Sequence, residues 1–340
     1  MRLLSIIAVF VIATLCAVNG YAQRWEKVTL PAPYNTGYYL DIFFLPDDPM
    51  RGWACDQNGG YVIRTVDGGR TWQGTKVDPA LGACHLEYIQ FLNANVGYCS
   101  GPCGMYKSID GGATWQSIKP ANTPFAWGGW FRNANEGWFT GGGCGFNTFF
   151  RTVDGGTTFD VYIDSVEKRS ALADPYWDAT MPANTLYAVG SGTIWRSETD
   201  GRTWEVFAYT GTNAPWHEEL AMVGTSILVP SGGGKCDSVP GVITGMRFSP
   251  DMGTTWRQYN TGENMFGTFL HDANRGWAAG WAASVYYTSN AGQTWQLRNC
   301  GLEGANTDDI FFQDNNTGWV VGDGVFRVAP ALRTQNKTVL

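Results

Sequence analysis

The stretch that decides the fold is Arg64-Thr65-Val66-Asp67-Gly68-Gly69-Arg70-Thr71-Trp72. It recurs with small changes at five further places: residues 107–115, 151–159, 197–204, 249–256 and 288–295. We call each copy a box. Two copies are degenerate, because Thr199 and Asn290 stand where the aspartate belongs. An aspartate whose oxygens accept backbone N–H groups, followed by glycine, is typical of a tight hairpin turn.

A second signature, a glycine–aromatic pair such as Gly52-Trp53, lies upstream of each box. Its other copies are Gly97-Tyr98, Gly137-Trp138, Leu186-Tyr187, Gly276-Trp277, Gly318-Trp319 and, more weakly, Ile227-Leu228. Together they define seven units. The aromatic residues that close successive boxes are 39 to 52 residues apart, which is the length of one four-stranded propeller blade. We therefore predict an all-β chain that folds as a single seven-bladed β-propeller.

The two ends of the chain predict how the ring closes. The last unit, residues 318–328, has no box, whereas residues 24–28 resemble the strand that follows one. We expect this N-terminal strand to complete the seventh blade, which removes exposed sheet edges. The predicted segments are a closing strand at 24–30, blades at about 38–77, 86–120, 126–164, 176–209, 218–261, 266–300 and 307–328, and a tail at 330–340.

The first 22 residues predict a signal peptide. Arg2 precedes an apolar run at 3–18, and Gly20-Tyr21-Ala22 supplies small residues at a cleavage site. The propeller would then occupy 23–329 of a secreted protein, extracellular or periplasmic. Without Arg2 the chain carries 22 basic and 30 acidic residues, a net charge of −8. This charge argues against nucleic acid as a partner, and no later run is long enough to span a membrane.

The box residues have a structural interpretation that we favour over catalysis. We expect the aspartates to fix turns between the third and fourth strands of a blade, and the closing aromatics to pack between blades. The aspartates are Asp67, Asp110, Asp154 and Asp251, and the closing tryptophans are Trp72, Trp115, Trp204, Trp256 and Trp295.

This pattern resembles the BNR/Asp-box superfamily. Within it, the Gly-Trp strand paired with Arg-Thr-x-Asp-Gly-Gly-x-Thr-Trp is most similar to the photosystem II stability/assembly factor family and its secreted bacterial relatives. The resemblance covers nearly all of the mature chain. It implies the propeller fold but not one function, because sialidases, xyloglucanases and sortilin-type receptors share the motif. The cysteines and the long insertions in blades four and five depart from the assembly factors.

One face of the predicted ring concentrates unusual residues. The loops that join blades, and those between second and third strands, emerge opposite the boxes. All seven mature cysteines fall there: Cys55, Cys84, Cys99, Cys103, Cys144, Cys236 and Cys300. Their pairing is open, and the pair we favour is Cys103 with Cys144, in matching loops of adjacent blades. A metal site at Cys84, His85 and Cys99 is an alternative that lacks a CxxC pair, so we predict no metal and no cofactor.

The same face holds our candidate ligand-binding residues, aromatic side chains and acids near the mouth of the channel. They are Trp127, Trp130, Trp177, Trp216, His217, Glu218 and Asp308. The alternative is that the aromatics form core and the acids line a solvated channel. We expect a non-enzymatic, monomeric binding or assembly module whose partner is a protein or a glycan. The other hypothesis is a glycan-active enzyme, a hydrolase or lyase, that uses Glu87, Asp178 or His217.

Overall fold

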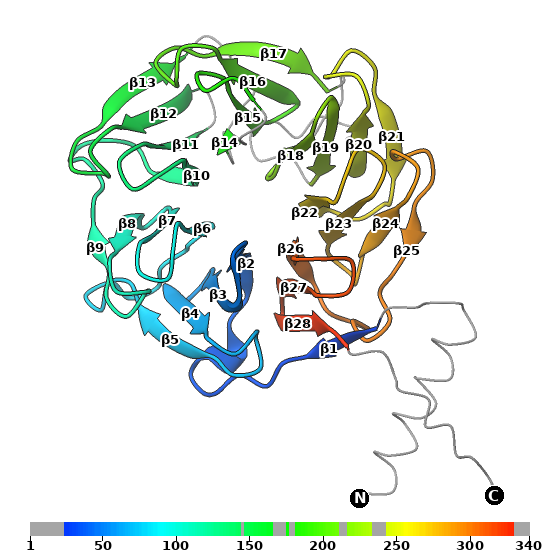
Figure 1. Cartoon of the computed structure of the whole chain (residues 1–340), viewed down its shortest axis with the longest axis horizontal. Helices are drawn as coiled ribbons and strands as arrows, with labels where there is room; N and C mark the ends of the chain where they lie inside the picture. The colour runs from blue at the N-terminus through cyan, green and yellow to red at the C-terminus, as the bar shows by residue number, and fades with distance from the viewer. Residues whose placement is uncertain are drawn as a thin grey trace, which may run out of the picture.

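The computed structural model describes residues 24–143, 146–165, 175–176, 181–210, 216–232 and 243–329. Six predicted features lie outside them: the signal peptide at 1–22, Cys144, Trp177, Asp178, Cys236 and the tail at 330–340. Within the described part, the strands form seven four-stranded antiparallel sheets arranged as a ring (Figure 1). The predicted all-β, seven-bladed propeller is confirmed.

In each blade the first strand lies nearest the axis. Blade one comprises β2 (Tyr39–Leu45), β3 (Asp48–Asp56), β4 (Tyr61–Thr65) and β5 (Gln73–Lys76). Blade two comprises β6 (Tyr88–Phe91), β7 (Gly97–Gly101), β8 (Gly104–Ser108) and β9 (Gln116–Ser117). Blade three comprises β10 (Ala126–Phe131), β11 (Gly137–Gly143), β12 (Phe146–Thr152) and β13 (Asp160–Asp164). One 3-10 turn, η1 (Tyr34–Thr36), precedes β2.

Blades four to six repeat the order. Blade four comprises β14 (Pro175–Tyr176), β15 (Leu186–Gly190), β16 (Thr193–Ser197) and β17 (Glu205–Tyr209). Blade five comprises β18 (Ala221–Val223), β19 (Ser226–Ser231), β20 (Gly245–Ser249) and β21 (Arg257–Asn260). Blade six comprises β22 (Met265–Leu270), β23 (Gly276–Gly280), β24 (Tyr286–Thr288) and β25 (Gln296–Leu297).

The seventh blade joins the two ends of the chain. Its strands are β26 (Thr307–Phe312), β27 (Gly318–Gly322), β28 (Gly324–Val328) and β1 (Trp25–Lys27). β1 pairs antiparallel with β28, so that Trp25 lies opposite Val328, as predicted. In Figure 1 the blue β1 accordingly lies beside the red β28.

The boxes form the turns that the sequence predicts. Asp67 Oδ1 accepts hydrogen bonds from the backbone N–H of Arg70 and Thr71, at 3.0 and 2.9 Å. The Thr71 hydroxyl donates to Asp67 Oδ2 at 2.6 Å. Gly69 has a φ of 77°, where a side chain would be strained. The degenerate boxes keep this geometry, because Thr199 and Asn290 accept the equivalent backbone bonds at 2.9 and 3.0 Å.

We expect Asp110→Ala to lower the free energy of unfolding by about 1 kcal/mol, because the turn loses an acceptor like a helix cap. Asp110 accepts from the backbone and hydroxyl of Thr114 at 2.8 and 2.7 Å. Thermal unfolding measures the loss, and ligand binding is expected to be unchanged. Lost binding at unchanged stability would instead give Asp110 a functional role.

Interlocking aromatic rings explain the glycine–aromatic signature. The ring of Phe44 on the inner strand covers Gly52 on β3, and a Cβ there would come within 2.4 Å of that ring. The same Phe44 ring stacks on Trp319 of the seventh blade, with centroids 3.7 Å apart. Trp53 stacks on Phe91 in the same way, at 3.7 Å. Gly52, Gly97, Gly137 and Gly318 each make room for such a ring, whereas Gly276 lies against Leu270.

The aromatics that close the boxes also pack between blades, as predicted. Each directly precedes the fourth strand rather than lying within it. Trp72, Trp204 and Trp295 are buried, whereas Trp115 and Trp256 are half-buried. Trp72 packs in one cluster with Trp319 and Val321 of the seventh blade. This packing seals the seam where the ring closes.

Candidate functional site

A cavity of about 360 Å³ opens at the mouth of the channel, on the face opposite the boxes. We call it the mouth cavity. Blades one, two, five, six and seven contribute its lining: Tyr38, Leu40, Gln57, His85, Glu87, Trp216, Glu218, Asn264, Phe266, Trp281, Asn306, Asp308 and Asp323. They come from the starts of inner strands and the adjoining loops. The face predicted from sequence therefore carries a well-formed cavity.

Aromatic side chains form one wall of the mouth cavity. Trp281 follows β23 and is 42% exposed, which is unusual for so large a side chain. Its indole N–H donates to the Tyr38 hydroxyl at 3.1 Å, and that hydroxyl donates to Asp308 Oδ2 at 2.9 Å. Phe266 packs against the Trp281 ring, with centroids 5.3 Å apart. These contacts hold an exposed aromatic surface beside a carboxylate.

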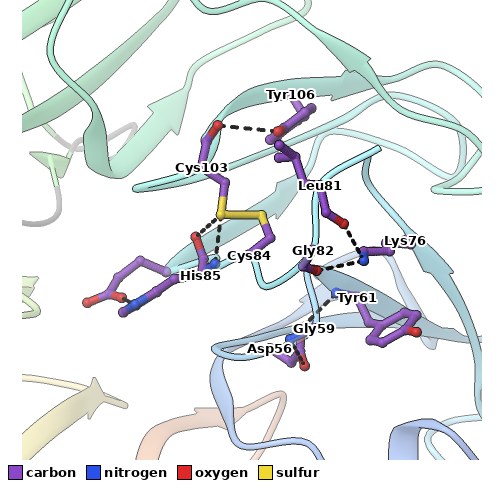
Figure 2. The surroundings of a disulfide bond; sticks show 11 residues. Asp56, Gly59, Tyr61, Lys76, Leu81, Gly82, Cys84, His85, Cys103 and Tyr106 are labelled. Atoms are coloured by element: carbon purple, nitrogen blue, oxygen red, sulfur yellow. Dashed lines mark hydrogen bonds and ion pairs between the residues drawn. A yellow bond between two sulfur atoms is a disulfide. The ribbon is translucent and has the colours of Figure 1, made fainter. Parts of the chain in front are cut away.

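The loop before β6 brings His85 and Glu87 to the opposite wall, where their side chains form a hydrogen-bonded pair. A disulfide joins the neighbouring Cys84 to Cys103 on the loop between β7 and β8 (Figure 2). The backbone N–H of His85 lies 2.7 Å from Cys103 Sγ. The disulfide thus fixes the backbone next to both cavity residues.

Further contacts stabilise the loop that carries His85 and Glu87. Lys76 Nζ donates to the carbonyl oxygens of Leu81 and Gly82, at 2.6 and 2.7 Å, as Figure 2 shows. Cys84 lies against the loop between β3 and β4, where it forms an isolated bridge with Gly59. The loop that places His85 and Glu87 at the cavity is therefore held by a disulfide, by hydrogen bonds from Lys76 and by a bridge to the preceding blade.

The structure corrects our expectation about the cysteines. Cys103 pairs with Cys84, so the favoured Cys103–Cys144 disulfide is wrong. Among the described residues, Cys55 and Cys99 are free thiols, and both are buried within strands β3 and β7 rather than on loops. Burial raises the pKa of each thiol well above its usual value. The alternative metal site at Cys84, His85 and Cys99 loses Cys84 to the disulfide.

Polar side chains on or beside the inner strands, three acids and Gln90, hold neighbouring blades together. Side-chain oxygens accept backbone N–H groups from the neighbouring blade. The bonds are Ile42 N to Asp309 at 2.9 Å, Ile89 N to Asp41 at 2.6 Å, Phe131 N to Gln90 at 2.7 Å and Thr268 N to Glu219 at 2.6 Å. These side chains join inner strands, so we assign them a structural role.

The structure places the described candidates from sequence in different surroundings. Trp216, Glu218 and Asp308 line the mouth cavity, as does Glu87 from the catalytic alternative. Trp127 lies behind the lining, its ring in contact with Trp216 and His85. Trp130 packs into the core between blades three and four.

His217 differs most from expectation, because its ring is fully buried away from the cavity. Its two ring nitrogens contact the Thr210 hydroxyl, at 2.7 Å, and the Pro230 carbonyl. Burial first, and then the charge of Arg247, lower the pKa of His217 to about 3. A neutral, enclosed imidazole does not act as an acid or base on a ligand in the cavity.

This burial predicts a pH-dependent stability. The unfolded chain protonates His217 below about pH 6.5 while the folded chain does not, so stability falls as the pH drops from 6.5 towards 3. At pH 4.5 the loss from this residue amounts to roughly 2–3 kcal/mol. We expect His217→Gln to remove that slope in denaturant unfolding measured at pH 7.0 and 4.5. Parallel pH profiles for both proteins would contradict this assignment.

Cavity residues that the sequence analysis did not select as ligand-binding include Trp281, Tyr38, Asn264 and Asp323. Trp281 follows Gly276-Trp277 by four residues, so it could be taken for part of the same strand. One sequence feature could have identified Trp281 as a cavity residue: it directly follows Gly280, where β23 ends and a loop of the mouth face begins.

The ring of sheets, its box turns and its closing N-terminal strand define an Asp-box β-propeller. The predicted resemblance to the photosystem II assembly factors is also confirmed. Residues 18–124 match the family model described as photosynthesis system II assembly factor YCF48. Comparison with curated proteins found no match.

Solved structures agree on the fold. A structure titled "YCF48 bound to D1 peptide" is 20% identical, with a TM-score of 0.66, over 89% of this chain and 96% of that one. YCF48 from Cyanidioschyzon merolae is 19% identical, with a TM-score of 0.65, over 90% and 98%. A xyloglucanase from Xanthomonas campestris is 14% identical, with a TM-score of 0.62, over 89% of this chain but 53% of the enzyme.

Proposed function

We propose that this chain is a secreted, non-enzymatic propeller that binds a protein partner through the mouth cavity. The observation that carries the proposal is the cavity itself, built by five blades and presenting the exposed Trp281. Exposed aromatic residues beside oriented polar groups are typical of sites where binding energy concentrates. The solved relative that binds a peptide and the match to an assembly-factor family support a protein as the partner.

Two observations support export. The first 22 residues have the composition of a signal peptide. The Cys84–Cys103 disulfide is of a kind that persists in oxidising compartments. No helix in the described residues is long and apolar enough to cross a membrane.

A peptide array tests the proposed function. Wild-type protein is expected to bind a subset of arrayed peptides, and Trp281→Ala to weaken that binding about tenfold or more, as for an interface hot spot. The matched control is Arg70→Ala, which changes an exposed residue on the box face. The proposal would be contradicted if Arg70→Ala lost peptide binding while Trp281→Ala kept it. It would also be contradicted if the wild-type protein bound no arrayed peptide.

A glycan-active enzyme is the second candidate, favoured by the carboxylates Glu87, Glu218 and Asp308 around an aromatic-walled cavity. The xyloglucanase, about twice the length of the matched region, shares the fold. Incubation with a panel of polysaccharides distinguishes the two candidates. Hydrolysis that Glu87→Gln abolishes would establish the enzyme, whereas the proposed binding function expects none.

A further inference from the structure

The mouth cavity concentrates negative charge. Four carboxylates line it: Glu87, Glu218, Asp308 and Asp323. Among the described residues, its lining includes no lysine or arginine, and the one histidine, His85, is paired with Glu87. Carboxylates around a concave, low-dielectric surface favour a positively charged occupant.

One cation, Lys27, lies beside a lining residue. Lys27 Nζ donates to the main-chain carbonyl of Asp323 at 2.6 Å, at an exposed position on the rim. The Asp323 carboxylate is oriented separately, because its Oδ2 accepts the backbone N–H of Asn306 at 2.8 Å. Asp308 is oriented by the Tyr38 hydroxyl. These hydrogen bonds fix the orientation of both carboxylates at the cavity.

The aromatic wall suits the same occupant. A guanidinium or ammonium group is attracted to the faces of tryptophan, tyrosine and phenylalanine, and Trp281, Phe266 and Trp216 line the same cavity as the carboxylates. The apolar stem of such a side chain packs on these rings while its charged end reaches the carboxylates. A cavity of about 360 Å³ is at the small end for ligand sites, so it fits one or two side chains rather than a folded element.

We propose that the mouth cavity recognises an arginine or lysine side chain presented by a segment of the partner protein. This inference rests on the proposed function and names the chemistry of the ligand. The carboxylates of Asp308 and Glu218 accept the N–H donors, and Trp281 covers the side chain from the solvent side. Binding is therefore expected to weaken as salt concentration rises.

The test uses pentapeptides with a central arginine, citrulline or glutamate in varied flanking sequences, measured by fluorescence anisotropy. Citrulline has nearly the shape of arginine without its charge. We expect arginine peptides to bind about tenfold more tightly than citrulline peptides, and glutamate peptides to bind more weakly still. Asp308→Asn and Glu218→Gln are expected each to lower affinity for the arginine peptide about tenfold.

The matched control is Asp47→Asn, which removes an exposed carboxylate from the opposite face. Its affinity is expected to equal that of wild type. Equal binding of arginine and citrulline peptides that still depends on Trp281 would overturn the charge assignment and leave the proposed function standing. Affinity that neither Asp308→Asn nor Glu218→Gln changes would also overturn it. The absence of any Trp281-dependent peptide binding would overturn both.

Discussion

Replacing Trp25 by alanine is expected to lower the free energy of unfolding by about 3–5 kcal/mol, the cost of emptying a large buried site. Trp25 is 1% exposed although it lies on the outermost strand of its sheet. Its indole N–H donates to the Arg298 carbonyl, and its backbone N–H donates to the Cys300 carbonyl, both at 2.8 Å. Its ring contacts Trp277 and Phe312, so one residue links blades six and seven.

Denaturant unfolding followed by tryptophan fluorescence and circular dichroism measures this loss. Trp281→Ala is the control, since it removes a tryptophan that is 42% exposed, and its stability is expected to stay close to wild type. If Trp25→Ala unfolded at the wild-type midpoint, β1 would not be closing the ring in solution.

Removing the Cys84–Cys103 disulfide is expected to lower stability by about 2–4 kcal/mol, because the unfolded chain loses a cross-link. The double variant Cys84→Ser with Cys103→Ser tests this by denaturant unfolding. We also expect weaker peptide binding, because the cross-link fixes the backbone next to His85 and Glu87 in the mouth cavity. Loss of stability with unchanged binding would limit the disulfide to a structural role.

Thiol titration of the denatured protein checks the pairing itself. The single variant Cys103→Ser is expected to expose one additional reactive thiol, and alkylation followed by peptide mapping should place it at Cys84. A newly labelled Cys144 would restore the pairing that the sequence analysis favoured and contradict the structure.

The repeats predict the fold almost completely because each box encodes its own turn chemistry. Asp67 and Gly69 specify one hairpin locally, and the spacing of such hairpins fixes the blade. Ring closure was predictable for the same reason, since Trp25 occupies the position of a box aromatic without a box before it. Local signals of this kind need no knowledge of distant contacts.

The candidate site was predictable only as a face of the ring. Trp216 and Glu218 line the cavity, whereas His217 between them is buried on the other side of the chain, because successive residues of an extended segment point in opposite directions. The disulfide prediction failed because equivalent loops need not be the ones in contact. Cys84 and Cys103 lie on two loops of the second blade, 19 residues apart in sequence, and matching loop positions across blades do not show that these two loops meet.

Hydrogen–deuterium exchange with the tightest-binding arrayed peptide tests the central claim, that a partner binds at the mouth cavity. We predict that bound peptide slows exchange in the loops at 77–87, 261–266 and 300–308 and leaves the box turns at 65–72 and 108–115 unchanged. Slower exchange in the box turns with no change in those three loops would contradict the claim.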